Sequence, residues 1–176
     1  MRRVWSWQND EMAHDVYDES FQYTIYIDTS PRRLWRALTD PIKTRKWWHV
    51  SFVTDWKVNS PMDVKMGHLT IRDPEQVILE SRSPVRLAYT WHTFTPEWAR
   101  VNGYSEEDRL KFAHEPRSKV AFDIEKTQGV VRLTLRHDGF DAGSIVLEAI
   151  REGWPPLLSS LKTFLETGEP LDFSMP

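Results

Sequence analysis

Residues 130–166, VVRLTLRHDGFDAGSIVLEAIREGWPPLLSSLKTFLE, contain the two elements that decide the fold. The run 130–137 alternates between apolar and polar side chains, and this period of two predicts a β-strand with one buried face. The inward-facing positions of that strand are Val131, Leu133, Leu135 and His137. Residues 144–166 instead place apolar side chains every three to four positions, which predicts a single long amphipathic helix.

The predicted helix begins at Ser144, and Pro155-Pro156 fall inside it. A proline inside a helix removes one backbone hydrogen bond and clashes with the carbonyl four residues earlier, so we expect a kink there. Most of the chain before this helix alternates like β-structure. Because a sheet and a helix that each carry one apolar face bury those faces against each other, we expect an α+β protein with a cavity between them.

Six further strands and three short helices are expected before residue 130. The expected strands cover residues 21–28, 52–58, 62–72, 76–81, 85–94 and 119–126. The expected helices cover residues 31–38, 42–47 and 106–113. Alternation places Phe52, Trp56 and Val58 on one inner face, and Val85 on the inner face of a later strand. A change of phase at Gly67 predicts a bulge or a turn.

The chain is expected to form one domain over residues 21–168. An irregular segment (1–20) precedes this domain, and a short tail (169–176) follows it. Residues 95–116 interrupt the sheet as a helical insertion that overhangs one end of it. This insertion is either a lid over the cavity or a surface excursion without a role in binding.

The composition excludes several classes of protein. The net charge of -3 provides no general attraction to nucleic acid or anionic lipid. The absence of cysteine excludes disulfides, thiolate metal sites and cysteine nucleophiles. No apolar run approaches the roughly 18 residues of a membrane span, and the N-terminus lacks the apolar core of a signal peptide. We therefore expect a cytoplasmic protein without a membrane span or a nucleic-acid partner.

No strong catalytic motif is present in the sequence. It contains no P-loop, no dinucleotide-binding glycine pattern, no HExxH and no GxSxG. The six histidines include no ligand-like pair four residues apart, so we expect neither a metal nor a cofactor. These absences do not favour an enzyme.

Four stretches of the sequence together resemble one family. They are IDTSPRRLWRALTDPIKTRKWW (27–48), VILESRSPVRLAYTWHTF (77–94), VVRLTLRHDGF (130–140) and GWPPLLSSLKTFLETG (153–168). With the order of expected elements, they resemble the START-like, or SRPBCC, superfamily. Within it, the chain is similar to bacterial proteins like the C-terminal domain of the activator of heat-shock-protein-90 ATPase.

The resemblance implies a helix-grip fold. In that fold a curved antiparallel sheet of about six to seven strands wraps around the long C-terminal helix, and two short helices follow the first strand. An apolar cavity lies between sheet and helix, and Trp47-Trp48 stand where relatives place its mouth. The expected cavity-lining residues are Trp35, Trp48, Phe52, Trp56, Tyr89, Trp91, Phe122, Leu135, His137, Trp154 and Leu158. The alternative is that these side chains simply close a core that is rich in tryptophan, of which the chain has nine.

Three functions follow from this resemblance. The first is the binding of a small hydrophobic or aromatic molecule, with His137 or Tyr89 fixing its orientation. The second is an aromatase- or cyclase-like enzyme that uses the same cavity, with His137 as the candidate general acid or base. The third is a co-chaperone-type ATPase activator, which rests on family analogy alone. Binding ranks first, His137 has a structural anchor as its alternative role, and the chain is expected to be a monomer or a homodimer.

Overall fold

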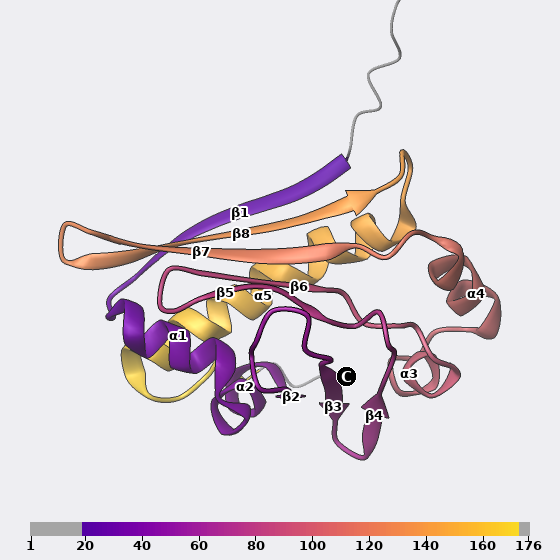
Figure 1. The fold of residues 1–176 in the computed structure, drawn as a ribbon, viewed down its shortest axis with the longest axis horizontal. Coiled ribbons are helices and arrows are strands. Elements are labelled where there is room, and N and C mark those ends of the chain that lie inside the picture. The colour runs from indigo at the N-terminus through magenta and orange to yellow at the C-terminus, as the bar shows by residue number, and fades with distance from the viewer. Residues whose placement is uncertain (1–18, 173–176) are drawn as a thin grey trace, which may run out of the picture.

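A curved antiparallel sheet of five strands covers the long C-terminal helix in the computed structural model, which describes residues 19–172 (Figure 1). Its strand order is β1-β8-β7-β6-β5. The strands are β1 (Glu19–Ile27), β5 (Ile78–Arg82), β6 (Arg86–Thr90), β7 (Lys119–Thr127) and β8 (Val130–Phe140). Of the expected irregular segment 1–20, positions 1–18 lie outside the described residues, and Glu19 begins β1. Positions 173–176 of the expected tail also lie outside them.

A second antiparallel sheet contains β2 (Val50–Val53), β3 (Asp63–Met66) and β4 (Leu69–Ile71). The phase change at Gly67 is a tight hairpin turn, in which Gly67 has a φ of 57° that favours glycine. The side chain of Gln76 connects the two sheets. Its amide donates to the Met62 carbonyl (2.5 Å) and accepts from the Thr93 backbone N–H (3.1 Å). The strands expected in a single sheet therefore divide into five and three.

The helices begin where hydroxyl, carboxylate and proline residues predict that they begin. They are α1 (Pro31–Thr39), α2 (Pro41–Trp48), α3 (Pro96–Val101), α4 (Glu106–His114) and α5 (Ile145–Thr167). Ser30 caps α1 and Asp40 caps α2, each by accepting hydrogen bonds from backbone N–H groups of the first turn. Helix α3 was not predicted, although Thr95-Pro96 carries the same start signal as Ser30-Pro31.

Two predicted details are wrong. The strand expected over residues 52–58 ends at Val53, and Trp56 adopts a φ of 58° that a strand cannot contain. Val58 is 54% exposed as a result. Val85, expected on the inner face of a strand, lies in the turn before β6 and is 49% exposed.

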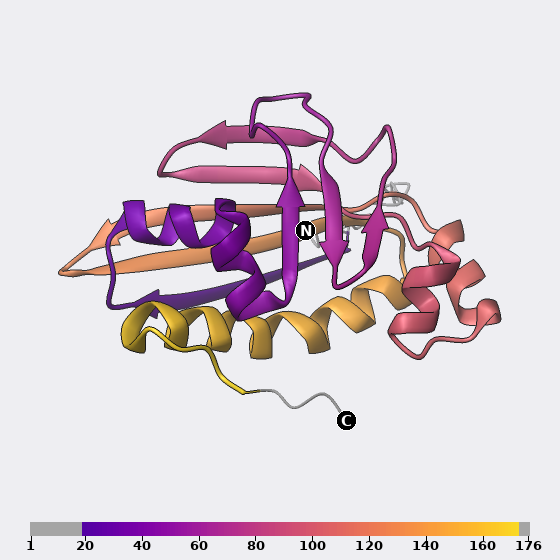
Figure 2. The ribbon, with the colours of Figure 1, turned by 90° about the horizontal axis from the view of Figure 1, so that it is seen from below.

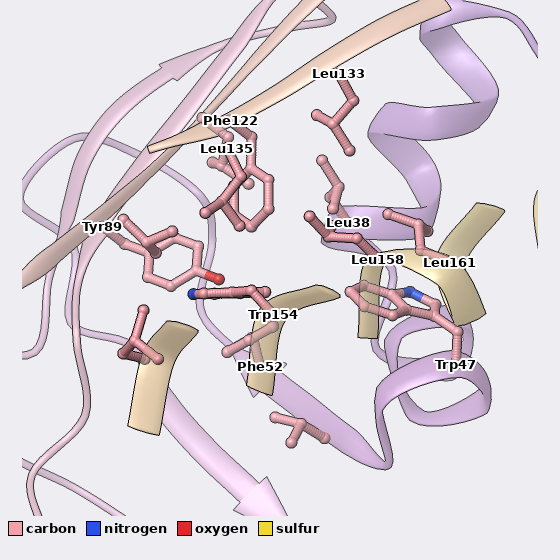
Figure 3. Close-up of a cluster of buried hydrophobic side chains, with 14 of the residues drawn as sticks. Leu38, Trp47, Phe52, Tyr89, Phe122, Leu133, Leu135, Trp154, Leu158 and Leu161 are labelled. Carbon is pink, nitrogen blue, oxygen red and sulfur yellow. The ribbon is translucent and has the colours of Figure 1, made fainter. Parts of the chain in front are cut away.

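The core lies between the five-stranded sheet and a layer that contains α5, α1, α2 and the small sheet (Figures 1 and 2). Helix α5 runs along the sheet without interruption through Pro155-Pro156. Leu133 and Leu135 of β8 point down to Leu158 and Leu161 of α5, and all four are fully buried (Figure 3). Burial of each such leucine contributes roughly 1.5–3 kcal/mol, so the predicted strand and helix both contribute to the core between sheet and α5.

The insertion packs against the end of the molecule where α5 begins (Figure 2). Glu115, just after α4, attaches it there. One oxygen of the carboxylate accepts from the backbone N–H groups of Ile145 (2.8 Å) and Val146 (3.3 Å), and the other bonds the Ser144 hydroxyl. A carboxylate at this position also interacts favourably with the helix dipole. The insertion and the N-terminus of α5 are thus held together.

Candidate functional site

An apolar pocket of about 170 Å³ lies between the insertion, the end of β6 and the first half of α5. Helix α5 supplies one wall with residues at helical spacing: Val146, Ala149, Ile150, Gly153, Trp154 and Leu157. The insertion and the segment before it supply aromatic side chains: Phe94, Trp98, Tyr104 and Phe112. The remaining lining residues are Trp48, Trp91 and His92.

The aromatic rings form a continuous layer around this pocket. Trp48, at the end of α2, has its ring centroid 5.1 Å from that of Trp154 and 6.3 Å from that of Trp91. On the opposite side, the Phe94 ring centroid lies 4.9 Å from that of Trp98 and 5.4 Å from that of Phe112. Interlocked rings hold the shape of a cavity because each ring has only two freely rotating side-chain bonds.

His137 lies behind this layer and is held on both ring nitrogens. The Trp154 indole N–H donates to Nδ1 over 3.1 Å, and Nε2 lies 2.9 Å from the Ser118 hydroxyl oxygen. Because an indole nitrogen only donates, Nδ1 carries no proton, and the neutral ring carries its proton on Nε2. Burial, with a smaller contribution from His92, lowers the pKa of His137 to about 3. The imidazole therefore stays neutral and links β8, the start of β7 and α5.

His92 is the imidazole that lines the pocket itself. Its Nδ1 lies 3.1 Å from the backbone carbonyl oxygen of Thr93. Burial, with a smaller contribution from the positive charge of Arg117, lowers the pKa of His92 to about 4. The ring packs between aromatic neighbours, with its centroid 5.1 Å from that of Phe94 and 5.4 Å from that of Trp98.

The sequence matches a known family along most of its length. Residues 28–166 match the family described as Activator of Hsp90 ATPase homolog 1-like protein. The chain belongs to this family. The resemblance that the four sequence stretches indicated is therefore confirmed, as is the fold class that it implied. A search among curated proteins finds no match.

Solved structures share the fold of this family member at low sequence identity. The Aha1 dimer from Colwellia psychrerythraea is 17% identical with a TM-score of 0.63, over 85% of this chain and 98% of that one. Protein MLL2253 from Mesorhizobium loti is 20% identical with a TM-score of 0.65, over 84% of this chain and 96% of that one. CalU16 from Micromonospora echinospora is 19% identical with a TM-score of 0.59, over 85% of this chain and 77% of that one.

Three of the predicted cavity residues of this family member line the pocket, namely Trp48, Trp91 and Trp154. The others lie in the core or beside it. Phe52, Tyr89, Phe122, Leu135, His137 and Leu158 are buried, and Trp35 and Trp56 are half-buried. Trp154 packs on Phe122 with ring centroids 5.8 Å apart, so the space deep under the sheet is filled with side chains (Figure 3). Ligand contact by these core residues stays a prediction.

The sequence interpretation considered the insertion as a lid but named none of its residues, nor Phe94 before it, as part of the pocket. Phe94, Trp98, Tyr104 and Phe112 stand at irregular intervals, so no helical or strand period marks them as one surface. Their aromatic character within an otherwise charged segment was the available signal. His92 was missed because it immediately follows the expected inward-facing Trp91, and alternation assigns it to the opposite face.

Two kinds of site are absent from residues 19–172. No group of three or more histidine and carboxylate side chains is arranged to hold a metal ion. No helix in this part of the chain is both long and apolar enough to cross a bilayer.

Burial raises the pKa of Tyr89, so its phenol stays protonated inside the core.

Proposed function

We propose that this protein binds a small apolar or aromatic molecule in the pocket between the insertion and α5. The observation that carries the proposal is the lining of that pocket, which consists almost entirely of aromatic and aliphatic side chains around about 170 Å³. Concave apolar sites with a few polar points are the usual form of small-molecule sites. The insertion supplies one wall of this pocket, so ligand binding requires the insertion to be in place.

The volume of this pocket, which is partly open, indicates the size of ligand that it can surround. An engineered apolar cavity of about 150 Å³ in another protein binds benzene. A pocket of about 170 Å³ therefore favours molecules of one or two aromatic rings. Ligands of this size gain at most a few tenths to about 1 kcal/mol per heavy atom, so we expect dissociation constants in the micromolar to millimolar range.

An enzymatic role through His137 has less support. Both nitrogens of that ring already bond to Trp154 and Ser118, and its side chain is 0% exposed. A general acid or base needs hydrogen-bond reach of its substrate, which this position lacks. ATPase activation rests on the family description alone, and no feature of the pocket favours it.

Ligand binding is tested by titration with benzene, indene and naphthalene. Trp48, Trp91 and Trp154 line the pocket, so binding is expected to change tryptophan fluorescence and to raise the melting temperature. Isothermal titration calorimetry then gives the dissociation constants. Failure of all three probes to bind at their solubility limits would contradict the proposal.

A pair of matched variants locates the binding site. Ala149→Leu adds three carbon atoms to a residue of the pocket wall and is expected to weaken naphthalene binding at least tenfold. Ala142→Leu adds the same atoms at an exposed turn outside the pocket and is expected to leave binding unchanged. Equal affinities in the two variants would place the ligand somewhere else.

A further inference from the structure

The pocket presents one polar group whose hydrogen-bonding role follows from its surroundings, the imidazole of His92. Its Nδ1 lies 3.1 Å from the Thr93 carbonyl oxygen. A carbonyl oxygen only accepts hydrogen bonds, so Nδ1 carries the proton of the neutral ring. The other nitrogen, Nε2, is then an acceptor with a free lone pair.

The acceptor is kept in place and kept neutral. Three aromatic rings restrict the orientation of the imidazole. They belong to Phe94, Trp98 and Trp91, and the Trp91 ring centroid lies 5.1 Å from that of His92. Burial lowers the pKa of His92 to about 4, so the lone pair on Nε2 persists at neutral pH.

Nε2 has no protein partner within the described part of the chain. No hydrogen bond among residues 19–172 involves this atom. The fully enclosed side-chain atoms without a partner in that part of the chain are Thr29 Oγ1, Arg117 Nε and Asp138 Oδ1. Since Nε2 is not one of them, it keeps some exposed surface. His92 lines the apolar pocket and also a neighbouring, more polar one that includes Glu75 and Arg117.

We propose that Nε2 of His92 accepts a hydrogen bond from the bound molecule, so that the pocket selects one- or two-ring aromatic compounds that carry a hydroxyl or N–H donor. Phenols, naphthols and indoles belong to this class, whereas plain hydrocarbons lack the donor. The inference rests on the proposed function, since it assigns the chemistry of a ligand held in the same pocket. His92 would act as a specificity-determining residue.

The expected preference is modest and measurable. A net hydrogen bond in a protein is worth about 1 kcal/mol, which corresponds to a fewfold to roughly tenfold change in affinity. 2-Naphthol and 2-methylnaphthalene form a suitable pair because a hydroxyl replaces a methyl group of nearly the same size. The quantity to measure by calorimetry is the ratio of their dissociation constants in each variant.

His92→Phe removes the acceptor and retains an aromatic ring, so it is expected to reduce the preference for 2-naphthol roughly three- to tenfold. His92→Gln keeps an acceptor near the position of Nε2 and is expected to retain most of the preference. His68→Phe, at the exposed β3–β4 turn, is the matched control and is expected to leave the ratio unchanged. The affinity for 2-methylnaphthalene shows whether each variant keeps a folded pocket.

The outcomes separate the two proposals. If neither compound binds the wild-type protein, the proposed function itself fails. If both bind and His92→Phe leaves their ratio unchanged, the role of His92 is overturned while the binding function stands. The ¹⁵N signal of His92 Nε2 gives an independent measurement in the wild-type protein, and a signal that 2-naphthol does not shift would also overturn the role.

Discussion

The buried imidazole of His137 is expected to make the folded protein sensitive to mild acid. Its pKa falls from an ordinary 6.5 to about 3 in the folded protein, because burial disfavours the charged ring. Between these two values the unfolded chain binds a proton that the folded chain does not bind. The free energy of unfolding therefore decreases as the pH falls through this window, by about 1.4 kcal/mol per pH unit.

The magnitude follows from the two pKa values. Lowering the pH from 7.5 to 4.5 costs the folded state about 2.5 kcal/mol through His137 alone. His137→Gln removes this proton linkage and also weakens the bonds to Ser118 and Trp154, which is expected to cost roughly 1–3 kcal/mol at pH 7.5. The difference in stability between wild type and variant is thus expected to shrink, or to change sign, as the pH falls.

Urea unfolding followed by tryptophan fluorescence at pH 7.5, 6.5, 5.5 and 4.5 measures this difference. His92 and the carboxylates titrate in both proteins, so their contributions largely cancel in the comparison. A stability difference that stays constant across the four pH values would refute the buried, neutral state of His137.

Three other substitutions test how the walls of the pocket are held. Glu115→Gln weakens the hydrogen bonds of that side chain to the N-terminus of α5, so it is expected to lower the free energy of unfolding in urea by about 1–2 kcal/mol. The control, Glu107→Gln on the exposed face of α4, is expected to lower it by less than about 0.5 kcal/mol. Equal losses would contradict the anchoring role of Glu115. Gln76→Leu leaves the buried Met62 carbonyl and the Thr93 N–H without partners, so it is expected to lower the free energy of unfolding by about 2–4 kcal/mol. The control is Gln22→Leu at an exposed position, and equal stability of the two variants would contradict the role of Gln76. Gly153→Ala is expected to raise the melting temperature by about 2–3 °C, since the added carbon meets no atom within 4 Å and alanine favours the helix; a lower melting temperature would be inconsistent with this reasoning.

The largest part of the fold follows from local patterns. Val131, Leu133 and Leu135 have the parity that predicts their burial, because a strand alternates its side chains wherever it lies in a sheet. Helix α5 begins at Ile145, one residue after the predicted start, and Ser144 caps it by accepting from the Leu147 N–H over 2.9 Å. These features depend on neighbours within a few residues, so the sequence suffices to predict them.

Alternation fails as a guide where the strand ends. Val58 continues the apolar pattern that starts at Phe52, yet the backbone turns at Trp56. That indole packs against α1 by donating from Nε1 to the Thr39 carbonyl over 3.0 Å. A contact across 17 positions decides this local conformation, and periodicity contains no information about it.

The position of the pocket also depends on contacts between residues that are distant in sequence. The wall formed by α5 has helical spacing and could be predicted, and Trp154 was expected to face a cavity. The opposite wall combines Trp98 and Phe112 from two helices whose docking depends on Glu115 and the N-terminus of α5. Only the packed structure brings these segments together.

The sequence by itself determined the class of fold, its long strand and helix, and the lack of a strong catalytic motif, since each is a property of short-range pattern and composition. The tertiary structure alone decided where space remains. Side chains from α2, α5 and the five-stranded sheet fill the region beneath the sheet, whereas the insertion leaves about 170 Å³ beside the start of α5. It also decided that His137 is enclosed, because the hydrogen bonds of its ring come from Ser118 and Trp154, which are distant in sequence. His92 lines the pocket because the insertion packs beside it. The position of a cavity depends on how side chains pack, and the tautomer of a histidine depends on which groups its nitrogens meet in the folded protein. The pattern of residue types along the sequence specifies neither.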